Sequence, residues 1–169
     1  GKNSYSGGTR VEGGELRSDD DDAFVNHTFY TVNAGKLNLN NHDLTMAQLS
    51  GKGGVVDITE ASLVIDQAFD SLYAGVFEGK GQAEKTGAST LYLSGDSTNY
   101  NGSFSVTGGG VDSSVALGGH ISIHNSGTLS AEGYLGDTEV RNGGTLRVSS
   151  YHSDKDTPAQ LIIDRKLIN

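Results

Sequence analysis

The triplet Gly95-Asp96-Ser97 is the first feature that could do chemistry, because several hydrolase families present a nucleophilic serine in such a triplet. A serine nucleophile needs a base within hydrogen-bonding distance and an oxyanion hole. The surrounding residues match neither GDSGG nor GxSxG. A similar segment at the start of the chain, Gly1 to Tyr5, is one residue shorter than Gly95 to Tyr100, so the loop tolerates a change in length. Because a nucleophile needs a fixed geometry, we interpret Asp96 and Ser97 as loop residues.

Histidine pairs could bind a metal ion, and His120 and His124 are the closest pair in the sequence. They flank Ile121 and Ile123 and are expected on the outer face of one strand. Four residues of strand separate two Cα atoms by ~13 Å, which is unfavourable for two short bonds to one zinc ion. The spacing HExxH does not occur. The sequence therefore predicts no catalytic residue, no cofactor and no metal ligand among the five histidines.

Four consecutive aspartates precede three aromatic residues, Phe24, Phe29 and Tyr30, in the segment 17–31, which we expect to be a protruding acidic and aromatic loop. Calcium binds carboxylate oxygens, but neither an EF-hand nor a GGxGxD repeat is present, and consecutive carboxylates repel one another. Calcium binding therefore stays open, and the aromatic residues either pack on the fold or contact a partner. The candidate partner-contact residues are Asp19, Asp20, Asp21, Asp22, Phe24 and Tyr30.

The composition limits the classes of partner. A net charge of −9 predicts a surface that repels nucleic acid, anionic lipid and heparin-like polyanions. The absence of cysteine excludes disulfides and thiolate metal sites. The 169 residues suffice for one domain with a sizeable core. Because the chain starts at Gly1 and contains neither a leader-like segment nor an apolar run of membrane length, we interpret it as an internal piece of a longer protein.

A short element recurs along the chain: an apolar residue, a turn that contains glycine, and a second apolar residue. The copies are VEGGEL, VNAGKL, ITEASL, VTGGGV, IHNSGTL and VRNGGTL. They recur roughly every 17–28 residues, which is typical of one solenoid coil. A glycine stands two residues before the final apolar position in every copy but ITEASL, which indicates a positive φ or a close backbone approach. The predicted turn glycines are Gly14, Gly35, Gly109, Gly127 and Gly144.

Apolar and polar residues alternate around each turn, as at Leu37 and Leu39, so that one face of each strand points inward. A single coil buries little apolar surface, and the core must come from stacked coils. We therefore predict an all-β fold, a parallel β-helix of about eight coils and on the order of 40 Å in length. The segment 65–76 competes with this prediction, because its apolar residues also recur at helical spacing.

Two segments of the chain resemble each other, SYSGGTRVEGGEL and NYNGSFSVTGGGV, with Tyr5 matching Tyr100 and Gly7 matching Gly102. Both are similar to the repeat in passenger domains of bacterial type V autotransporters, as are LNLNNHDLTMAQLSGKGG and LVIDQAFDSLYAGVFEGKGQAEKTGASTLYLSG. The resemblance covers most of positions 3–148 and implies a right-handed parallel β-helix.

The resemblance implies that residues 1–169 are a single β-helix segment of a larger passenger, located at the bacterial cell surface or secreted. Residues 149–160 match the repeat poorly and are expected to form a loop. The family's N-terminal signal and C-terminal β-barrel are not part of this sequence. That barrel would anchor the passenger to the outer membrane.

The function implied by the resemblance is not enzymatic. The segment would act as an adhesin or in self-association (aggregation or biofilm) through its extended β-helix face. Its partners would be host-surface or matrix molecules or another copy of the passenger. Two alternatives stay open: a non-catalytic stem of a serine-protease autotransporter with an upstream catalytic domain, and a β-helix polysaccharide lyase or hydrolase.

Overall fold

The computed structural model describes residues 2–148, 161–163 and 167–168, so the loop expected at 149–160 lies outside the described residues. The described residues form short strands and no helix. The strands are β1 (Thr9–Val11), β2 (Glu15–Arg17), β3 (Thr28–Val32), β4 (Lys36–Asn38), β5 (Leu44–Ser50), β6 (Val55–Asp57), β7 (Ser62–Asp66), β8 (Ser71–Tyr73), β9 (Val76–Glu78), β10 (Gln82–Thr86), β11 (Thr90–Leu93), β12 (Ser103–Val106), β13 (Gly110–Ser113), β14 (Leu117–Ile123), β15 (Thr128–Ala131), β16 (Gly133–Val140), β17 (Thr145–Val148), β18 (Leu161–Ile163) and β19 (Leu167–Ile168).

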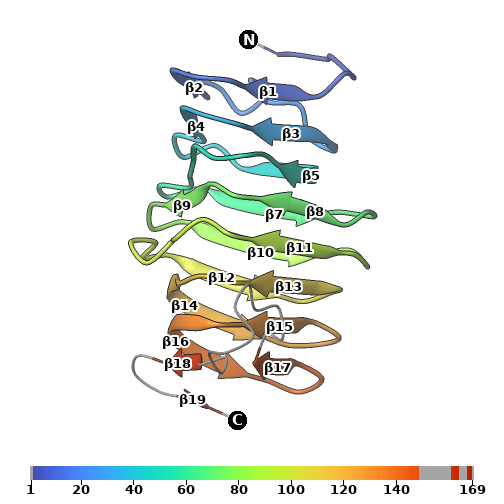
Figure 1. Cartoon of the computed structure of the whole chain (residues 1–169). Helices are drawn as coiled ribbons and strands as arrows, with labels where there is room; N and C mark the ends of the chain where they lie inside the picture. Colours follow the sequence, from blue (N-terminus) through green and yellow to red (C-terminus); the bar gives the residue numbers. More distant parts are fainter. Residues whose placement is uncertain (1, 149–160, 164–166, 169) are drawn as a thin grey trace.

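The strands stack as a parallel β-solenoid of about seven turns, close to the eight coils expected (Figure 1). One long sheet has the order β1-β3-β5-β7-β10-β12-β14-β16-β18, with β19 also paired to β16. A first short sheet has the order β2-β4-β6-β9, and a second short sheet has the order β8-β11-β13-β15-β17. Every strand pairing between coils is parallel, which confirms the predicted fold class.

The segment 65–76 is extended rather than helical. It contributes to β7, β8 and β9, and Leu63 and Ile65 are buried while Val64 between them is partly exposed. Leu63 pairs with Leu44 on one side and Ala83 on the other. Pairing with both neighbouring coils satisfies the backbone hydrogen bonds and buries the apolar face of the strand. For this reason the segment is a strand although its apolar residues also recur at helical spacing.

The copy ITEASL is not a turn element of the kind that the sequence suggested. Its Leu63 lies in the long sheet, whereas Val56 takes the place between Leu37 and Phe77 in the first short sheet. The turn glycine of this coil is Gly54, with a φ of +74°. Ala61 departs from the glycine pattern because it occupies a different place in the coil.

Glycine is required at the predicted turn positions for two different structural reasons. Gly14, Gly35 and Gly109 have φ values of +66°, +73° and +59°, which are unfavourable for residues other than glycine. Gly127 and Gly144 instead lie against the preceding coil. A Cβ on them would come within 2.1 and 2.2 Å of a carbonyl oxygen of that coil.

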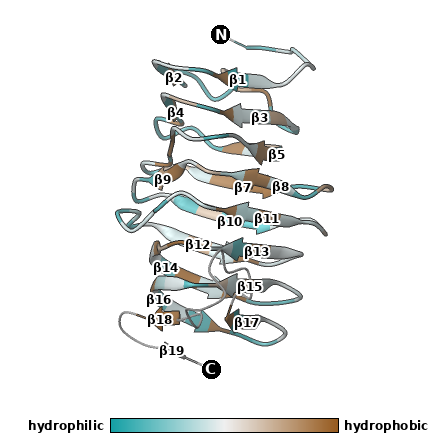
Figure 2. Cartoon of the chain, in the orientation of Figure 1, coloured by the Kyte–Doolittle hydropathy of each residue, from teal (hydrophilic) through white to brown (hydrophobic). Residues whose placement is uncertain are grey.

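The core consists of the inward residues of every coil, and Figure 2 shows brown apolar stretches along β7 and β8 beside teal polar positions. Aromatic rings reinforce its middle: Phe77 lies with its ring centroid 5.5 Å from that of Tyr73 and 5.7 Å from that of Phe104. The Tyr100 hydroxyl lies 2.9 Å from the carbonyl oxygen of Gly81 in the preceding coil. A Cβ on Gly102 would lie 2.6 Å from this hydroxyl, so only glycine leaves room for it at this position.

Side-chain oxygens of Asn and Asp also tie successive coils together. Each accepts a backbone N–H from the coil that follows, at 2.7 Å. The pairs are Asn26 with Thr45, Asp43 with Ser62, and Asp70 with Thr90. None of the described residues belongs to a helix long and apolar enough to cross a membrane.

Candidate adhesive surface

Ser97 has a structural role at the point where its loop meets the neighbouring coils. The side chain is buried, and its Oγ accepts a hydrogen bond from the amide of Phe77 at 3.0 Å. The Ser97 amide donates to the carbonyl of Ala116 at 2.9 Å. Asp96 accepts a hydrogen bond from the amide of Thr98 at 3.0 Å, which closes an Asx turn. Asp96 and Ser97 are thus engaged with the backbone, as expected of loop residues.

The four aspartates of the loop after β2 engage different partners. Asp19 lies 2.8 Å from the guanidinium of Arg17, and Asp21 lies 2.6 Å from Nδ1 of His42. A hydrogen bond from the amide of Asp22 lowers the pKa of Asp20. Among the described residues, no group of three or more His, Cys, Asp or Glu side chains converges on a possible metal position. Contact with a partner stays a prediction for these aspartates.

Phe24 and Tyr30 lie inside the fold. They are 7% and 1% exposed, and their rings meet edge to face with centroids 6.3 Å apart. The Tyr30 hydroxyl donates to the carbonyl of Val25 at 2.9 Å. Burial removes these two aromatic side chains from the surface that a partner could touch, which corrects their assignment as contact residues. Tyr30 belongs to β3 and not to the loop.

His120 and His124 lie beside charged residues of β16 and its C-terminal end. The Nε2 atom of His120 lies 4.0 Å from the carboxylate of Glu139. Arg141 lies 2.7 Å from the same carboxylate and lowers the pKa of Glu139 by its hydrogen bond. This cluster mixes opposite charges at the surface, and the described residues contain no group of three or more His, Cys, Asp or Glu side chains that could hold a metal ion.

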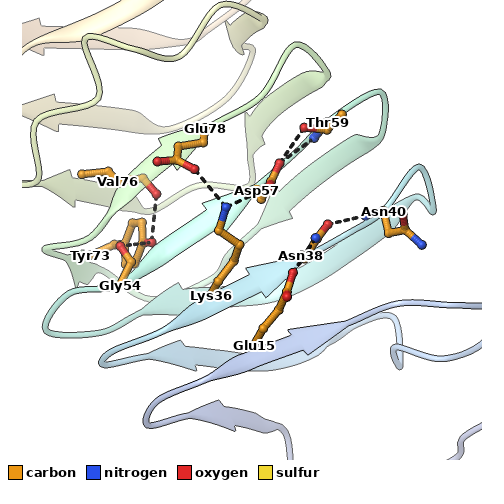
Figure 3. Close-up of polar contacts among 10 residues, drawn as sticks. All are labelled: Glu15, Lys36, Asn38, Asn40, Gly54, Asp57, Thr59, Tyr73, Val76 and Glu78. Atoms are coloured by element: carbon orange, nitrogen blue, oxygen red, sulfur yellow. Dashed lines mark hydrogen bonds and ion pairs between the residues drawn. The ribbon is translucent and has the colours of Figure 1, made fainter.

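The first short sheet presents a charged ladder on its outer face (Figure 3). The Nζ atom of Lys36 lies 3.2 Å from the Asp57 carboxylate and 3.1 Å from the Glu78 carboxylate, and so bridges neighbouring coils. Asn38 donates to Glu15 at 2.7 Å. Burial raises the pKa of Asp57, but hydrogen bonds from Thr59 and Lys36 outweigh it and the net shift is downward.

The charges of this ladder are therefore largely satisfied within the protein. The hydrogen bond to Glu78 raises the pKa of Lys36, as expected for an ammonium group that is held by carboxylates. A partner that covered this face would have to desolvate paired charges with little new interaction in return. We interpret the charged ladder as a stabilising network between coils.

The second short sheet presents a different outer face. Leu72 of β8 and Tyr92 of β11 stand side by side in register and are 53% and 42% exposed. The row continues through Asp112, Ser130 and Arg147 on the next three strands. A hollow of about 500 Å³ lies at the apolar end of this row, lined by Leu72, Tyr92, Leu93, Ser94, Asp112 and Ser114.

The strand interpretation of the segment 65–76 contains a signal for this face that the sequence analysis did not use. A helix would place Leu72 and Tyr73 together with the core. In an extended strand, neighbouring side chains point to opposite faces, so the burial of Tyr73 requires the exposure of Leu72. The exposed apolar pair follows directly once β8 is recognised as a strand.

Comparison with known proteins adds two findings. The model of the passenger-associated-transport-repeat family matches residues 1–17 and 84–112. The chain is also 36% identical, over 120 residues, to the adhesin BmaC autotransporter of Brucella suis biovar 1 (strain 1330). That match covers 70% of this chain but only 3% of the Brucella protein. No solved structure matches the chain.

Proposed function

The chain belongs to the passenger segments of bacterial type V autotransporters, and from this premise we propose that it acts as an adhesive segment through the outer face of its second short sheet. Its place is the bacterial cell surface or the extracellular medium. The chain spans about 3% of the length of its Brucella relative, which is named as an adhesin. The activity and partners of the whole passenger are therefore part of the proposal.

The observation that carries the proposal is the exposed pair Leu72 and Tyr92 beside the hollow on the second short sheet. Full burial of a large apolar side chain contributes about 1.5–3 kcal/mol, and aromatic residues are enriched where partners bind. Because both side chains are already about half covered, one such contact is weak. Adhesion then requires many copies of the passenger on one cell, where avidity multiplies weak contacts.

The partner that fits this face best is a host-surface or matrix protein with basic residues near an apolar contact. Asp112 follows Tyr92 in the row and offers a carboxylate beside the apolar end. A net charge of −9 opposes the approach of a second copy of the chain and attracts a basic surface. Self-association is therefore the second choice, and binding rather than catalysis is the proposed mode of action.

The experiment compares bacteria that display the full passenger with and without the substitutions Leu72→Ser and Tyr92→Ser. A matched control is Phe29→Ser, which removes another exposed aromatic side chain, on the long sheet. We expect adhesion to immobilised matrix proteins and host cells to fall several-fold in the double variant and to stay unchanged in the control. Thermal unfolding of the purified segments checks that all three fold alike.

Each other outcome has a defined meaning. Equal adhesion and equal cell-to-cell aggregation of the double variant and the parent refute the proposed face. Loss of cell-to-cell aggregation with unchanged host adhesion identifies the partner as another copy of the passenger. If neither changes, even when residues 1–169 are deleted, the segment is a stem or spacer.

A further inference from the structure

We propose a second binding site, for a neutral linear polysaccharide, along one edge of the long sheet. The site is built on a column of residues without long side chains, one from each of five successive coils. The column consists of Ala61, Gly81, Gly102, Gly119 and Gly136, and we call it the glycine column. It is distinct from the second short sheet, and its partner is a different class of molecule.

The glycine column is fixed by close contact between coils. A Cβ on Gly136 would lie 2.0 Å from the carbonyl oxygen of Gly119, and one on Gly119 would lie 2.4 Å from that of Gly102. The same holds for Gly102 against Gly81, at 2.0 Å, and for Gly81 against Ala61, at 2.3 Å. Four of the five positions therefore exclude side chains. The column itself is buried except at Gly119, which is partly exposed, so a ligand contacts the hollows and the polar side chains beside the column rather than the glycines.

Polar residues border the glycine column on one side. Each directly follows a column residue, and all five pair in register along the long sheet. This polar row is Ser62, Gln82, Ser103, His120 and Asp137. At ~4.8 Å for each step between strands, the row spans roughly 19 Å. That length accommodates several sugar rings of an extended chain.

Two hollows lie on the glycine column. The first has a volume of about 300 Å³ and is lined by Thr98, Asn101, Gly102, Gly118, Gly119, His120, Tyr134, Gly136 and Asp137. The second has a volume of about 330 Å³ and is lined by Asp43, Glu60, Ala61, Ser62, Lys80, Gly81 and Gln82. Ser103 of the polar row stands between them.

A β-bulge adjoins the first hollow. Between Leu117 and His120 the register of β14 against β16 shifts, because Gly118 and Gly119 face the single residue Gly136. Gly119 has a φ of +79° at this place. Bulges bend a strand and re-aim its side chains, and they are enriched beside functional sites.

The chemistry of the lining selects the class of ligand. Both hollows are lined by amide, hydroxyl and carboxylate groups. The first adds the imidazole of His120 and the ring of Tyr134, and the second adds the amine of Lys80. Sugar hydroxyls both donate and accept hydrogen bonds, and the carbon face of a pyranose stacks on an aromatic ring. Drug-like and lipid ligands prefer mostly apolar pockets, so a carbohydrate fits best.

The charge of the site selects a neutral carbohydrate over an acidic one. Asp43 and Glu60 accompany Lys80 in the second hollow, and Asp137 accompanies His120 in the first. Added to a net charge of −9, these carboxylates repel uronic acids and sialic acids. The polysaccharide is bound and not cleaved.

The test uses titration calorimetry of the chain with hexamers of glucose, mannose and N-acetylglucosamine, and with hexagalacturonate as the acidic counterpart. Ser103→Trp places a bulky side chain in the polar row between the two hollows, and His120→Ala removes a side chain that lines the first. Ser130→Trp on the second short sheet is the matched control. We expect at least one neutral hexamer to bind, with a tenfold weaker affinity for Ser103→Trp and an unchanged affinity for Ser130→Trp.

Four results overturn the proposal: no neutral hexamer binds, only hexagalacturonate binds, the neutral hexamers are shortened on incubation, or binding survives both substitutions in the polar row. Circular dichroism and thermal unfolding verify the fold of each variant. If Ser103→Trp does not fold, His120→Ala alone decides, because its side chain is half exposed and its removal leaves the core intact. A threefold or greater loss is expected for this variant.

Discussion

Lys85 occupies a core position of β10, and its replacement by methionine is predicted to stabilise the fold at neutral pH. Lys85 pairs in register with Ile65 on one side and Val106 on the other, and its side chain is fully buried. Its Nζ atom donates to the carbonyl of Thr86 at 2.5 Å. Burial lowers the pKa of the ammonium group from 10.5 to about 8, although nearby carboxylates oppose this shift.

The sign and size of the effect follow from this pKa. Between pH 8 and 10.5 the unfolded chain binds more protons at Lys85 than the folded chain, so stability rises with pH across that window. Below it, the folded state carries the full penalty of a buried charge. A shift of this size corresponds to on the order of 3 kcal/mol. Loss of the hydrogen bond to Thr86 offsets ~1 kcal/mol, which leaves a net gain of about 2 kcal/mol for methionine.

Guanidinium unfolding of the parent chain and of Lys85→Met at neutral and alkaline pH measures this difference. We expect the advantage of the variant to shrink by ~2 kcal/mol between about pH 7 and pH 9.5. The buried tyrosines titrate equally in both proteins and cancel in the comparison. Lys52→Met, which removes an exposed lysine, is expected to show no such trend. If the difference in unfolding free energy between Lys85→Met and the parent is the same at both pH values, the reasoning is refuted.

Two further substitutions probe the contacts between coils. Tyr100→Phe removes a buried hydroxyl that bonds to the preceding coil and is expected to cost ~1 kcal/mol in urea unfolding, whereas Tyr5→Phe, with an exposed hydroxyl, is the neutral control. Equal effects of the two would contradict the role given to the buried hydroxyl. Lys36→Met breaks the charged ladder and is expected to cost about 1 kcal/mol or less at pH 7. The lowered pKa of Asp57 means that its contribution is present at neutral pH, so the difference should vanish as the pH falls through that pKa. A cost that persists in acid would show that Lys36 acts through packing instead.

The local pattern of the sequence was sufficient to predict the fold class. In a parallel solenoid every coil meets a similar coil above and below, so the alternation within one strand determines which side chains enter the core. Leu37 and Leu39 or Ile121 and Ile123 are fully buried, as their spacing predicts. The same rule also explains Lys85, because Ala83 two residues earlier is buried and the strand carries both inward.

Pairing between coils was not accessible from the local pattern. The burial of Phe24 and Tyr30 depends on contacts across the loop after β2, and an acidic neighbourhood gave the opposite impression. The place of Leu63 depends on its neighbours Leu44 and Ala83, which are about twenty positions away in the sequence. Local spacing contains no information about such partners, so the copy ITEASL was misplaced.

The coil of β7, β8 and β9 divides the rod into two structural parts. It supplies the last strand of the first short sheet and the first strand of the second, so the charged ladder ends at Glu78 where the apolar row begins at Leu72. The long sheet continues through this coil without a break, from Ser62 to Gln82. A partner of the second short sheet therefore leaves the charged ladder hydrated, while a ligand on the glycine column passes the division. The two proposed sites can then be tested separately by substitutions in one chain, because each lies on a different sheet.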